Sequence, residues 1–272
     1  MVKEEFGTAT LIFGDAFEIL PTLEDGSIDF VCSDPPYAAP SFGKKCTACD
    51  WDTPINLPEF WRLLESKAKP QANVVLFGNM KFGFDLIATN KKNFRYDLVF
   101  AKSNRVGFLN ANLQPLRSHE LLLCFSNRPG FAKSSTYNPL KTPGGRTSVR
   151  RAKTRKPGGV YPPLEAQTTV SPDGMLYPHS VLAFDHDRGN LPGLHPTQKP
   201  VDLLGWLVLT YSNPGDVVLD CFMGSGTTGE AAVRLGRKFI GIEKNREFYE
   251  VACRRIEEVQ RRRSVRFGGT KS

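Results

Sequence analysis

One segment of the chain combines closely spaced glycines with an acid and an aromatic residue. It runs Asp220-Cys221-Phe222-Met223-Gly224-Ser225-Gly226-Thr227-Thr228-Gly229, between a predicted strand and a predicted helix. Its glycines permit a tight turn and let a ligand approach the backbone closely. Glu243 follows Asp220 by 23 positions, and an acid there can accept hydrogen bonds from ribose hydroxyls. The same spacing is also typical of a dinucleotide site, or of a turn that only packs a helix on a strand.

A second segment combines a carboxylate, two prolines and an aromatic ring. Ser33-Asp34-Pro35-Pro36-Tyr37 directly follows the apolar run Ile28–Cys32. The two prolines fix the turn and remove two backbone donors, which leaves carbonyl acceptors available to a ligand. The Asp34 carboxylate can accept hydrogen bonds, and the Tyr37 ring can stack on a planar group. The simpler structural interpretation is a proline turn capped by Asp34, with Tyr37 in the core.

The elements that must position these segments alternate between apolar runs and helical patterns. Strands are predicted at Ala9–Phe13, Ile28–Cys32, Asn73–Phe77, Tyr96–Ala101, Glu120–Phe125, Asp216–Cys221 and Lys238–Glu243. Helices are predicted at Asn56–Ala68, Lys81–Ala88, Pro200–Ser212, Gly229–Leu235 and Asn245–Arg261. This alternation indicates an α/β protein with a mostly parallel sheet covered on both faces. Both segments would then follow the carboxyl ends of strands, where open sheets bind ligands.

The middle of the chain, from about Ser126 to Asn190, is rich in Gly, Pro, Ser, Thr, Lys and Arg and shows no sustained period. It includes an acid-free basic run, which is typical of a solvated loop or of a surface that contacts phosphates. The run contains Lys141, Arg146, Arg150, Arg151, Lys153, Arg155 and Lys156. We therefore predict three parts: residues 1–125, an insert at 126–190, and residues 191–272.

Composition bounds the remaining possibilities. The 272 residues are 40% hydrophobic and 24% charged, with 36 Lys and Arg against 28 Asp and Glu and a net charge of +8. This is ordinary globular composition, and its basic balance favours polyanionic partners. No apolar run reaches the roughly 18 residues of a membrane helix, and the beginning of the chain shows no signal-peptide pattern. We therefore expect a cytoplasmic protein.

The six cysteines lie scattered at positions 32, 46, 49, 124, 221 and 253. This spacing predicts buried thiols in a reducing compartment rather than a disulfide framework. Cys46-x-x-Cys49 would suit zinc, but no second Cys-x-x-Cys or paired His supplies the remaining ligands. We therefore predict no metal site.

The order of the motifs resembles that of S-adenosylmethionine-dependent DNA amino-methyltransferases with the β permuted arrangement. Asp-Pro-Pro-Tyr comes first, a variable basic segment follows, and Phe-x-Gly-x-Gly-Thr comes last. The resemblance covers about Gly7–Phe125 and His195–Glu258. Gly14-Asp15-Ala16 is similar to the family's acidic loop near the cofactor adenine, and His195–Pro200 to the segment before the cofactor-binding helix. Cys49-Asp50-Trp51-Asp52 is similar to a motif of phage and prophage members.

The resemblance implies a Rossmann-like methyltransferase fold with a mostly parallel seven-stranded sheet and an irregular basic recognition insert. It implies S-adenosylmethionine as cofactor, double-stranded DNA as substrate, and both a homodimer and a cognate restriction endonuclease as partners to test for. By analogy, Asp34 and the Pro35 carbonyl would accept the N–H groups of an adenine amine, which attacks the sulfonium methyl in line. Tyr37 would stack on the base after it leaves the duplex.

The residue assignments follow from the same resemblance. The catalytic set is Asp34, Pro35, Pro36 and Tyr37. The cofactor-binding set is Asp15, Lys199, Asp220, Phe222, Gly224, Ser225, Gly226, Thr227 and Glu243. The DNA-contacting set is Arg105 together with the basic run: Lys141, Arg146, Arg150, Arg151, Lys153, Arg155 and Lys156.

Several alternatives stay open at this point. Asp rather than Ser before Pro-Pro-Tyr favours adenine N6, with cytosine N4 or an RNA base as the alternatives. Cytosine C5 chemistry is rejected because no Cys follows a Pro. A nicotinamide oxidoreductase would leave Asp-Pro-Pro-Tyr unexplained, and a catalytically silent nucleic-acid binder would not need both motifs intact.

Overall fold

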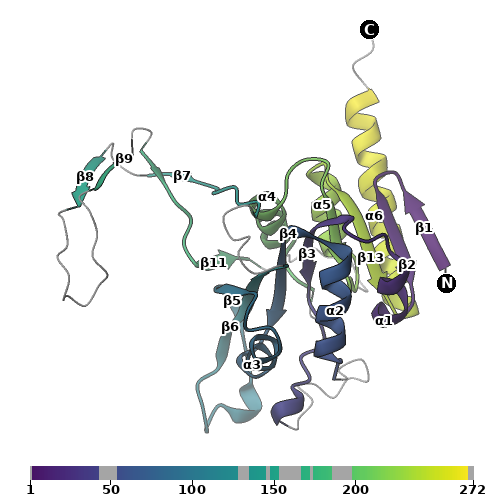
Figure 1. Cartoon of the computed structure of the whole chain (residues 1–272), viewed down its shortest axis with the longest axis horizontal. Helices are drawn as coiled ribbons and strands as arrows, with labels where there is room; N and C mark the ends of the chain where they lie inside the picture. The colour runs from purple at the N-terminus through teal and green to yellow at the C-terminus, as the bar shows by residue number, and fades with distance from the viewer. Residues whose placement is uncertain are drawn as a thin grey trace. The chain divides into compact units, whose positions relative to one another are not determined.

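The computed structural model describes residues 2–42, 54–127, 135–144, 148–152, 167–171, 174–185 and 198–268 (Figure 1). The chain divides into two compact units, Met1–Asn138 with Ser180–Ser272, and Pro139–His179. Both predicted motifs belong to the first unit.

The first unit is built on a sheet that has nine strands in the described part of the chain. In spatial order they are β1 (Val2–Phe6), β2 (Ala9–Phe13), β13 (Lys238–Glu243), β12 (Val217–Asp220), β3 (Ile28–Ser33), β4 (Ala68–Gly78), β6 (Arg117–Ser126), β5 (Phe94–Val106) and β11 (Val181–Phe184). Neighbouring strands are parallel except at β1–β2, β4–β6 and β6–β5. The predicted mostly parallel sheet is therefore confirmed.

The predicted count of seven strands is wrong, because a short strand is added at each edge. β1 pairs with β2 through a hairpin in which Gly7 has a positive φ of 57°. Its sequence, Val-Lys-Glu-Glu-Phe, is exposed over most of its length and so carries no buried apolar run. β11 pairs with β5 and lies within the range predicted as the irregular insert. The polar strand β1 therefore has little apolar signal in the sequence, whereas β11 is a run of only four apolar residues.

Helices cover both faces of the sheet, as predicted. One layer contains α1 (Ala16–Ile19), α2 (Leu57–Lys67) and α3 (Met80–Thr89), and the other contains α4 (Val201–Tyr211), α5 (Thr227–Arg234) and α6 (Arg246–Gly268). Successive residues of a strand enter opposite layers, so Val74 and Leu76 pack with the first layer while Val75 and Phe77 pack with the second. The continuous apolar runs of the sequence follow from this burial on both faces.

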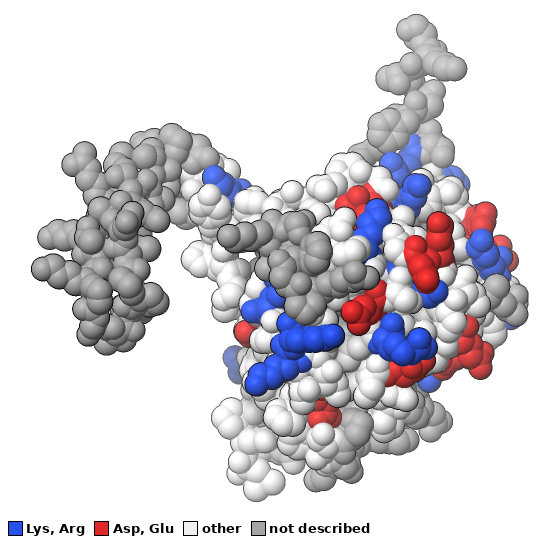
Figure 2. All heavy atoms as spheres, viewed as in Figure 1, with Lys and Arg blue, Asp and Glu red and all other residues white. Residues whose placement is uncertain are grey.

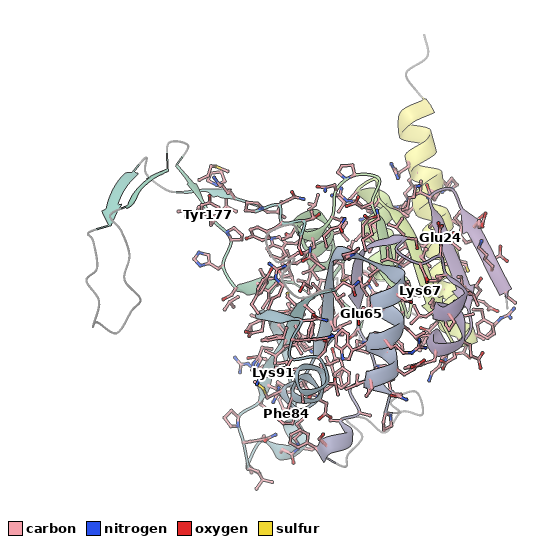
Figure 3. All side chains as sticks on the ribbon, in the orientation of Figure 1. Glu24, Glu65, Lys67, Phe84, Lys91 and Tyr177 are labelled. Atoms are coloured by element: carbon pink, nitrogen blue, oxygen red, sulfur yellow. The ribbon has the colours of Figure 1, made fainter. Side chains whose placement is uncertain are left out.

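Side-chain caps begin the two helices that follow β3 and β4. The Asn56 side chain accepts a hydrogen bond from Glu59 N at the start of α2, and Asn79 accepts one from Phe82 N at the start of α3. At the other end of α2, the buried Lys67 ammonium donates to the Pro21 and Leu23 carbonyls (Figure 3). These contacts join α2 to the loop that leads into β3.

The sheet has a topological switch point between β3 and β12. β3 leads through α2 to β4 on one side, whereas β12 leads through α5 to β13 on the other. The two strands run parallel, with Val218 opposite Phe30, and Cys221 N donates to Ser33 Oγ at 2.8 Å. The segments after these strands therefore begin side by side, at the place where open α/β sheets bind ligands.

The second unit contains two short antiparallel pairs within its described residues. β7 (Thr142–Pro143) pairs with β10 (Met175–Leu176), and β8 (Ser148–Ala152) pairs with β9 (Gln167–Ser171). Adjoining parts of the predicted 126–190 insert belong to the first unit, where Asn138 N donates to Thr210 O. The role of residues 126–190 in target recognition stays a prediction.

The described residues also bear on membranes, metals and thiols. None of the helices in these ranges is long and apolar enough to cross a bilayer. The same ranges contain no group of three or more His, Cys, Asp or Glu that could hold a metal ion, while Cys46 and Cys49 lie outside them. Cys32, Cys124 and Cys221 are buried free thiols, and burial raises the pKa of Cys124 to about 12. These thiols are structural rather than nucleophilic.

Candidate active site

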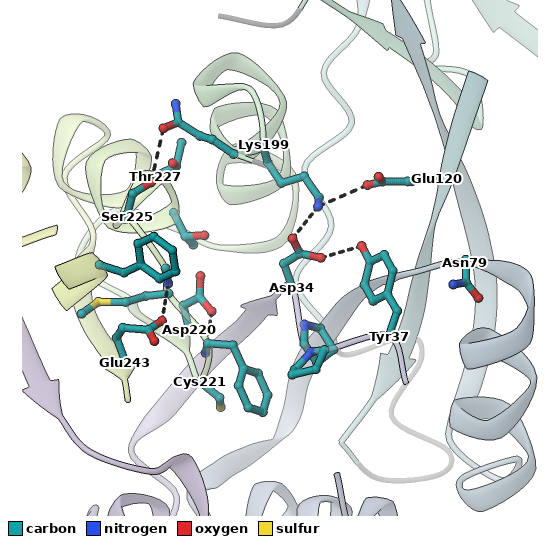
Figure 4. Close-up of a pocket in the computed structure, with 18 of the residues that line it drawn as sticks. Asp34, Tyr37, Asn79, Glu120, Lys199, Asp220, Cys221, Ser225, Thr227 and Glu243 are labelled. Atoms are coloured by element: carbon teal, nitrogen blue, oxygen red, sulfur yellow. Dashed lines mark hydrogen bonds and ion pairs between the residues drawn. The ribbon is translucent and has the colours of Figure 1, made fainter. Parts of the chain in front are cut away.

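A single cavity of about 760 Å³ receives both predicted segments (Figure 4). Its lining includes Asp34 and Tyr37 from the segment after β3, and Gly224 from the turn after β12. Glu243, from the end of β13, lies in the same wall. The volume is within the range of small-molecule and cofactor sites. The cavity is large enough to receive a cofactor together with part of a second reactant.

The glycine turn is held by its own backbone. Gly226 N donates to Met223 O at 2.9 Å, and Met223 N donates to Ile242 O at 3.0 Å. Gly224 and Gly226 have positive φ angles of 51° and 80°, and Gly226 caps the start of α5. Side chains other than glycine rarely adopt this conformation. The turn therefore presents backbone rather than side chains to the cavity at Gly224.

Glu243 is positioned by backbone donors on both oxygens. Gly224 N donates to Oε2 at 2.9 Å and Asn245 N to Oε1 at 2.7 Å. Burial raises the pKa of this carboxyl above its ordinary value, while these backbone N–H groups oppose the rise. A carboxylate has about four acceptor sites, so acceptor capacity remains for a ribose hydroxyl. Glu243 therefore fits the wall of an adenosine-binding site.

The other walls of this end of the cavity agree with that ligand chemistry. Phe222 lines the cavity and packs against Phe60 with ring centroids 5.8 Å apart. Asp15 also lines it, and its side chain accepts a hydrogen bond from Phe17 N at 2.8 Å to begin α1. An aromatic ring, an acid and exposed turn backbone are suited to a nucleoside with a charged tail. The residues present therefore fit an adenosine-containing cofactor.

The glycine turn also determines how closely α5 approaches α6. A Cβ built at Gly226 would lie 2.9 Å from the Ala252 Cβ, whereas one at Gly215, which also has a positive φ of 87°, meets no atom within 4 Å. We expect Gly226→Ala to lower the free energy of unfolding by roughly 2–4 kcal/mol, from backbone strain and overpacking together. Gly215→Ala, the matched control, carries only the strain of roughly 1–3 kcal/mol. Equal losses of unfolding free energy for the two variants, measured in urea, would contradict the close approach of α5 to α6.

Asp220, at the end of β12, is buried and has a strongly shifted acidity. Burial raises the pKa of its carboxyl to about 7, against hydrogen bonds from Thr228, the Phe222 backbone and Ser33. Asp220 Oδ1 accepts the Phe222 N–H at 3.1 Å and so shapes the first residue of the turn. Near neutral pH this carboxyl is partly protonated.

This shift predicts a pH-dependent stability. Because the folded pKa is raised, the stabilisation is present below the unfolded pKa and is lost as the pH rises through the folded value near 7. Asn cannot titrate, so we expect Asp220→Asn to gain stability relative to the unmodified protein as the pH rises from about 5 to about 8. Thermal unfolding of both proteins across this range tests it, and a difference independent of pH would contradict it.

Asp34 lies at the end of β3 with both oxygens engaged. Tyr37 Oη donates to Oδ1 at 2.5 Å, and the Lys199 ammonium pairs with Oδ2. The Tyr37 ring stacks on Phe82 at 5.8 Å between centroids. Asp34, Pro35, Pro36 and Tyr37 all line the cavity, which brings the predicted catalytic set together. Two acceptor sites of the Asp34 carboxylate remain for another donor.

A chain of alternating charges extends from Asp34 into the wall of the cavity (Figure 4). Lys199 Nζ lies 3.2 Å from Glu120 Oε2, and Glu120 in turn pairs with Lys102. Lys199 was predicted to bind the cofactor, but the structure places its ammonium between two carboxylates, and the cofactor role stays a prediction. Glu120 and Lys102 were not singled out from the sequence. The only signal was an acid at the beginning of the apolar run Leu121–Phe125.

The charges of this chain stabilise one another. Burial acts to raise the pKa of Glu120, but Lys199 and Lys102 outweigh it and hold the pKa below its ordinary value. Burial acts to lower the pKa of Lys199, but Asp34 and Glu120 outweigh it and raise that pKa. Lys199 and Glu120 are therefore both charged over the neutral range.

The remaining predicted residues line the cavity, lie on other described parts of the chain, or lie outside the described residues. Ser225 and Thr227 line the cavity and bond to neighbours, with Ser225 Oγ donating to Gln198 and Arg255 donating to Thr227 Oγ1 at 2.6 Å. Arg105 is exposed at the end of β5. Lys141, in the second unit, has its ammonium 4.6 Å from the Tyr177 ring centroid. Arg150 and Arg151 belong to β8, while Arg146, Lys153, Arg155, Lys156, the Cys49–Asp52 motif and His195 lie outside the described residues.

Comparison with known proteins agrees with this geometry. The profile of a family described as DNA methylase matches residues 28–254. The chain is 29% identical to the type II methyltransferase M.HpaI of Haemophilus parainfluenzae, over 91% of this chain and 74% of that protein. It is 25% identical to the type II methyltransferase M2.DpnII of Streptococcus pneumoniae, over 91% and 89%.

Two solved structures show the same fold. The complex of M1.HpyAVI with SAM has a TM-score of 0.59 at 22% identity and covers 91% of this chain and 99% of that one. The PvuII DNA methyltransferase, described as cytosine-N4-specific, has a TM-score of 0.62 at 17% identity and covers 93% and 92%.

Proposed function

This chain belongs to the N6/N4 family of DNA methylases and is an S-adenosylmethionine-dependent DNA amino-methyltransferase; from that premise we propose that its target atom is N6 of adenine in double-stranded DNA. The position of Asp34-Pro35-Pro36-Tyr37 in the same cavity as the glycine turn and Glu243 supports an amine as the target. Asp34, rather than Ser, before Pro-Pro-Tyr favours adenine N6 over cytosine N4. A planar amine held at Asp34 would face a cofactor held at the turn.

The cofactor, when bound, supplies a methyl group made electrophilic by its attachment to a sulfonium sulfur. The backbone of the glycine turn and the Glu243 carboxylate would hold the cofactor, with Asp15 and Phe222 completing the wall. Gly226 does not line the cavity; we assign it to closing α5 against α6. This division leaves Gly224, Ser225 and Thr227 as the part of the turn that faces the ligand.

Asp34 and the Pro35 carbonyl orient the target amine. The lone pair of an adenine amine is delocalised into the ring, so the nitrogen is a poor nucleophile. When Asp34 and the Pro35 carbonyl accept hydrogen bonds from its two N–H groups, the nitrogen is favoured in a tetrahedral geometry with a lone pair free to attack. The negative carboxylate stabilises the positive charge that develops on the nitrogen. Asp34 can then accept the proton that the nitrogen loses. Positioning and charge stabilisation account for the catalysis without a metal or a covalent intermediate.

Tyr37 and Lys199 keep this carboxylate in place. Tyr37 donates to one oxygen and Lys199 pairs with the other, so the Asp34 side chain is held from both sides. The Tyr37 ring also supplies an aromatic surface in the cavity for the flipped base. Phe82 packs against the ring and restricts its rotation.

DNA would be bound by positive side chains outside the cavity. Arg105, on β5, and the basic run of residues 141–156 are the proposed phosphate contacts, and residues 126–190 supply base recognition. A homodimer and a cognate restriction endonuclease remain part of the proposal as partners. If these side chains contact phosphates, the affinity for DNA should fall steeply as the salt concentration rises.

Nucleoside analysis tests the choice of base. Purified protein is incubated with labelled S-adenosylmethionine and unmethylated plasmid DNA, and the DNA is digested to nucleosides. Label in N6-methyladenine is the expected result. Label in N4-methylcytosine, the chemistry named for the PvuII enzyme, would keep the mechanism and overturn the base. Absence of label from DNA, with cofactor bound, would overturn the proposal and direct the same assay to RNA.

A further inference from the structure

The connection between β5 and β6 ends in an exposed apolar tip, which we define as residues 106–116. Phe108, Leu109 and Leu113 are 68%, 101% and 84% exposed. In Figure 1 this connection extends beyond the sheet at the lower left. The lower left end of the molecule is largely white in Figure 2, with Lys and Arg side chains above it. Large apolar side chains gathered on an exposed tip indicate a surface that is covered in function.

The tip has a defined backbone conformation. Gly107, with a positive φ of 95°, leads into a 3-10 turn at Phe108–Asn110. Ala111 N donates to Phe108 O at 3.1 Å, and Leu113 N and Gln114 N both donate to Asn110 O. The apolar side chains are therefore carried on successive hydrogen-bonded turns. Such a tip can be presented to a partner at a smaller entropic cost than a flexible loop.

The tip lies at the rim of the catalytic cavity. β5 runs parallel to β4, because each is antiparallel to β6, so its carboxyl end shares the edge of the sheet that carries Asp34. Val106 and Gln114 of the tip line the cavity. The two strands that carry the tip add Lys102, Arg117, His119 and Glu120 to the same lining. A macromolecule whose base enters this cavity must therefore pass close to the tip.

The charges around the tip favour a polyanion. Arg105 and Arg117 flank it on the two strands, and both are exposed. No acidic residue occurs between them in the sequence, whereas Asn110, Asn112 and Gln114 supply amide donors and acceptors. Apolar side chains between flanking arginines are suited to insertion between stacked bases while the cations contact the phosphates.

We propose that the apolar tip, Phe108, Leu109 and Leu113, inserts into the DNA duplex beside the target base and occupies the space that the base leaves when it enters the cavity. The proposal rests on the proposed function, since it needs a base in duplex DNA as substrate. Extrusion of a base loses stacking and pairing, and an apolar wedge replaces the lost stacking. The tip would thus assist base flipping without touching the reacting atoms.

The test separates flipping from chemistry by the pairing of the target base. The methylated site is first mapped in plasmid DNA treated with the unmodified protein. Two oligonucleotide duplexes then carry that site, one fully paired and one with a mismatch opposite the target, where flipping is easier. Single-turnover methylation is measured for the triple variant Phe108→Ser, Leu109→Ser, Leu113→Ser, and for Val2→Ser. Val2 is an exposed apolar control on the edge strand β1, where it pairs with Phe13 at the opposite edge of the sheet.

We expect the triple variant to be about 100-fold slower on the paired duplex and within about 5-fold of the unmodified protein on the mismatched one. Val2→Ser should match the unmodified protein on both duplexes, and cofactor affinity should be unchanged in every protein. Equal rates for the triple variant and the unmodified protein on the paired duplex would overturn the proposal. So would a defect of the same size on both duplexes.

Light scattering distinguishes DNA from a second copy of this chain as the occupant of the tip. The triple variant and the unmodified protein are expected to have the same molar mass. A lower mass for the variant would overturn the proposal and assign the tip to a contact between subunits. If the unmodified protein methylates no DNA base at all, the proposed function fails first, and the wedge fails with it.

Discussion

Asp34→Asn is expected to lower the rate of methyl transfer by about 10³-fold while cofactor affinity changes little. Asn preserves the size of the side chain but removes its negative charge and replaces one acceptor oxygen with an NH₂ donor. The two oxygens of Asp34 now accept from Tyr37 and pair with Lys199. Asn would place its NH₂ against one of these donors, so the carboxylate's orientation and its stabilisation of the attacking nitrogen are both lost. Single-turnover methylation and calorimetric titration of the cofactor measure the two effects.

Tyr37→Phe is the matched control for this change. It removes the hydroxyl that donates to Asp34 Oδ1 and keeps the ring that stacks on Phe82. Loss of one donor to a carboxylate that keeps its charge should slow methylation by only about 10-fold. If Asp34→Asn lowered cofactor affinity as much as it lowered the rate, the assignment of Asp34 to the target amine would be contradicted. Asp34 would then belong to the cofactor site rather than to the site of the amine.

The two motifs could be predicted because each is a short segment that follows a strand. Strand, turn and helix are local features, so Asp34 and the Gly224–Gly226 turn were placed at carboxyl ends from the sequence alone. Parallel pairing of β3 and β12 then brings the two segments into one cavity. The prediction succeeded because parallel strands separated by helices all end at the same edge of the sheet.

Glu120 and Lys102 could not be found in this way. They lie on the antiparallel strands β6 and β5, and they approach Lys199 only after the sheet has formed. Neither residue belongs to a motif, and a single acid next to an apolar run has many interpretations. The edge strand β1 was missed for a different reason, because its exposed polar residues give no apolar pattern. The tip at residues 106–116 was missed because the sequence does not show that its apolar residues are exposed.

The charge chain behind Asp34 predicts a large stability effect at Lys199. Lys199 is 8% exposed, and it is the cation shared by the carboxylates of Asp34 and Glu120. Lys199→Met would leave these two negative groups without the charge between them. Removing one member of a buried ion pair typically costs roughly 3–5 kcal/mol, and we expect a loss of that size in the free energy of unfolding measured in urea.

Lys69→Met is the matched control. Lys69 pairs with Asp29 through one carboxylate, but its side chain is 38% exposed. Pairs that water reaches contribute about 0–1 kcal/mol, so this change should have a much smaller effect. Similar losses for the two variants would show that burial does not strengthen the Lys199 pair.

A second substitution identifies the source of the loss at Lys199. Glu120→Gln added to Lys199→Met removes one of the stranded carboxylates, so the double variant should recover part of the stability lost in the single variant. Strict additivity of the two single changes would contradict a direct Lys199–Glu120 interaction. Because Lys102 also pairs with Glu120, the recovery should be incomplete.

The pH dependence of the Lys199 effect has a sign set by both partners. The pKa of Glu120 is lowered from its ordinary 4.5, so its contribution is present above that value and is lost as the pH falls through the folded pKa. The pKa of Lys199 is raised from its ordinary 10.5, so its contribution is present below that value and is lost as the pH rises through the folded pKa. The difference in unfolding free energy between the unmodified protein and Lys199→Met should therefore be constant from about pH 5 to about pH 10 and shrink on either side. A difference that changes steadily through neutral pH would show that one partner is uncharged there, and Lys199 could not then hold the Asp34 carboxylate as an ion pair.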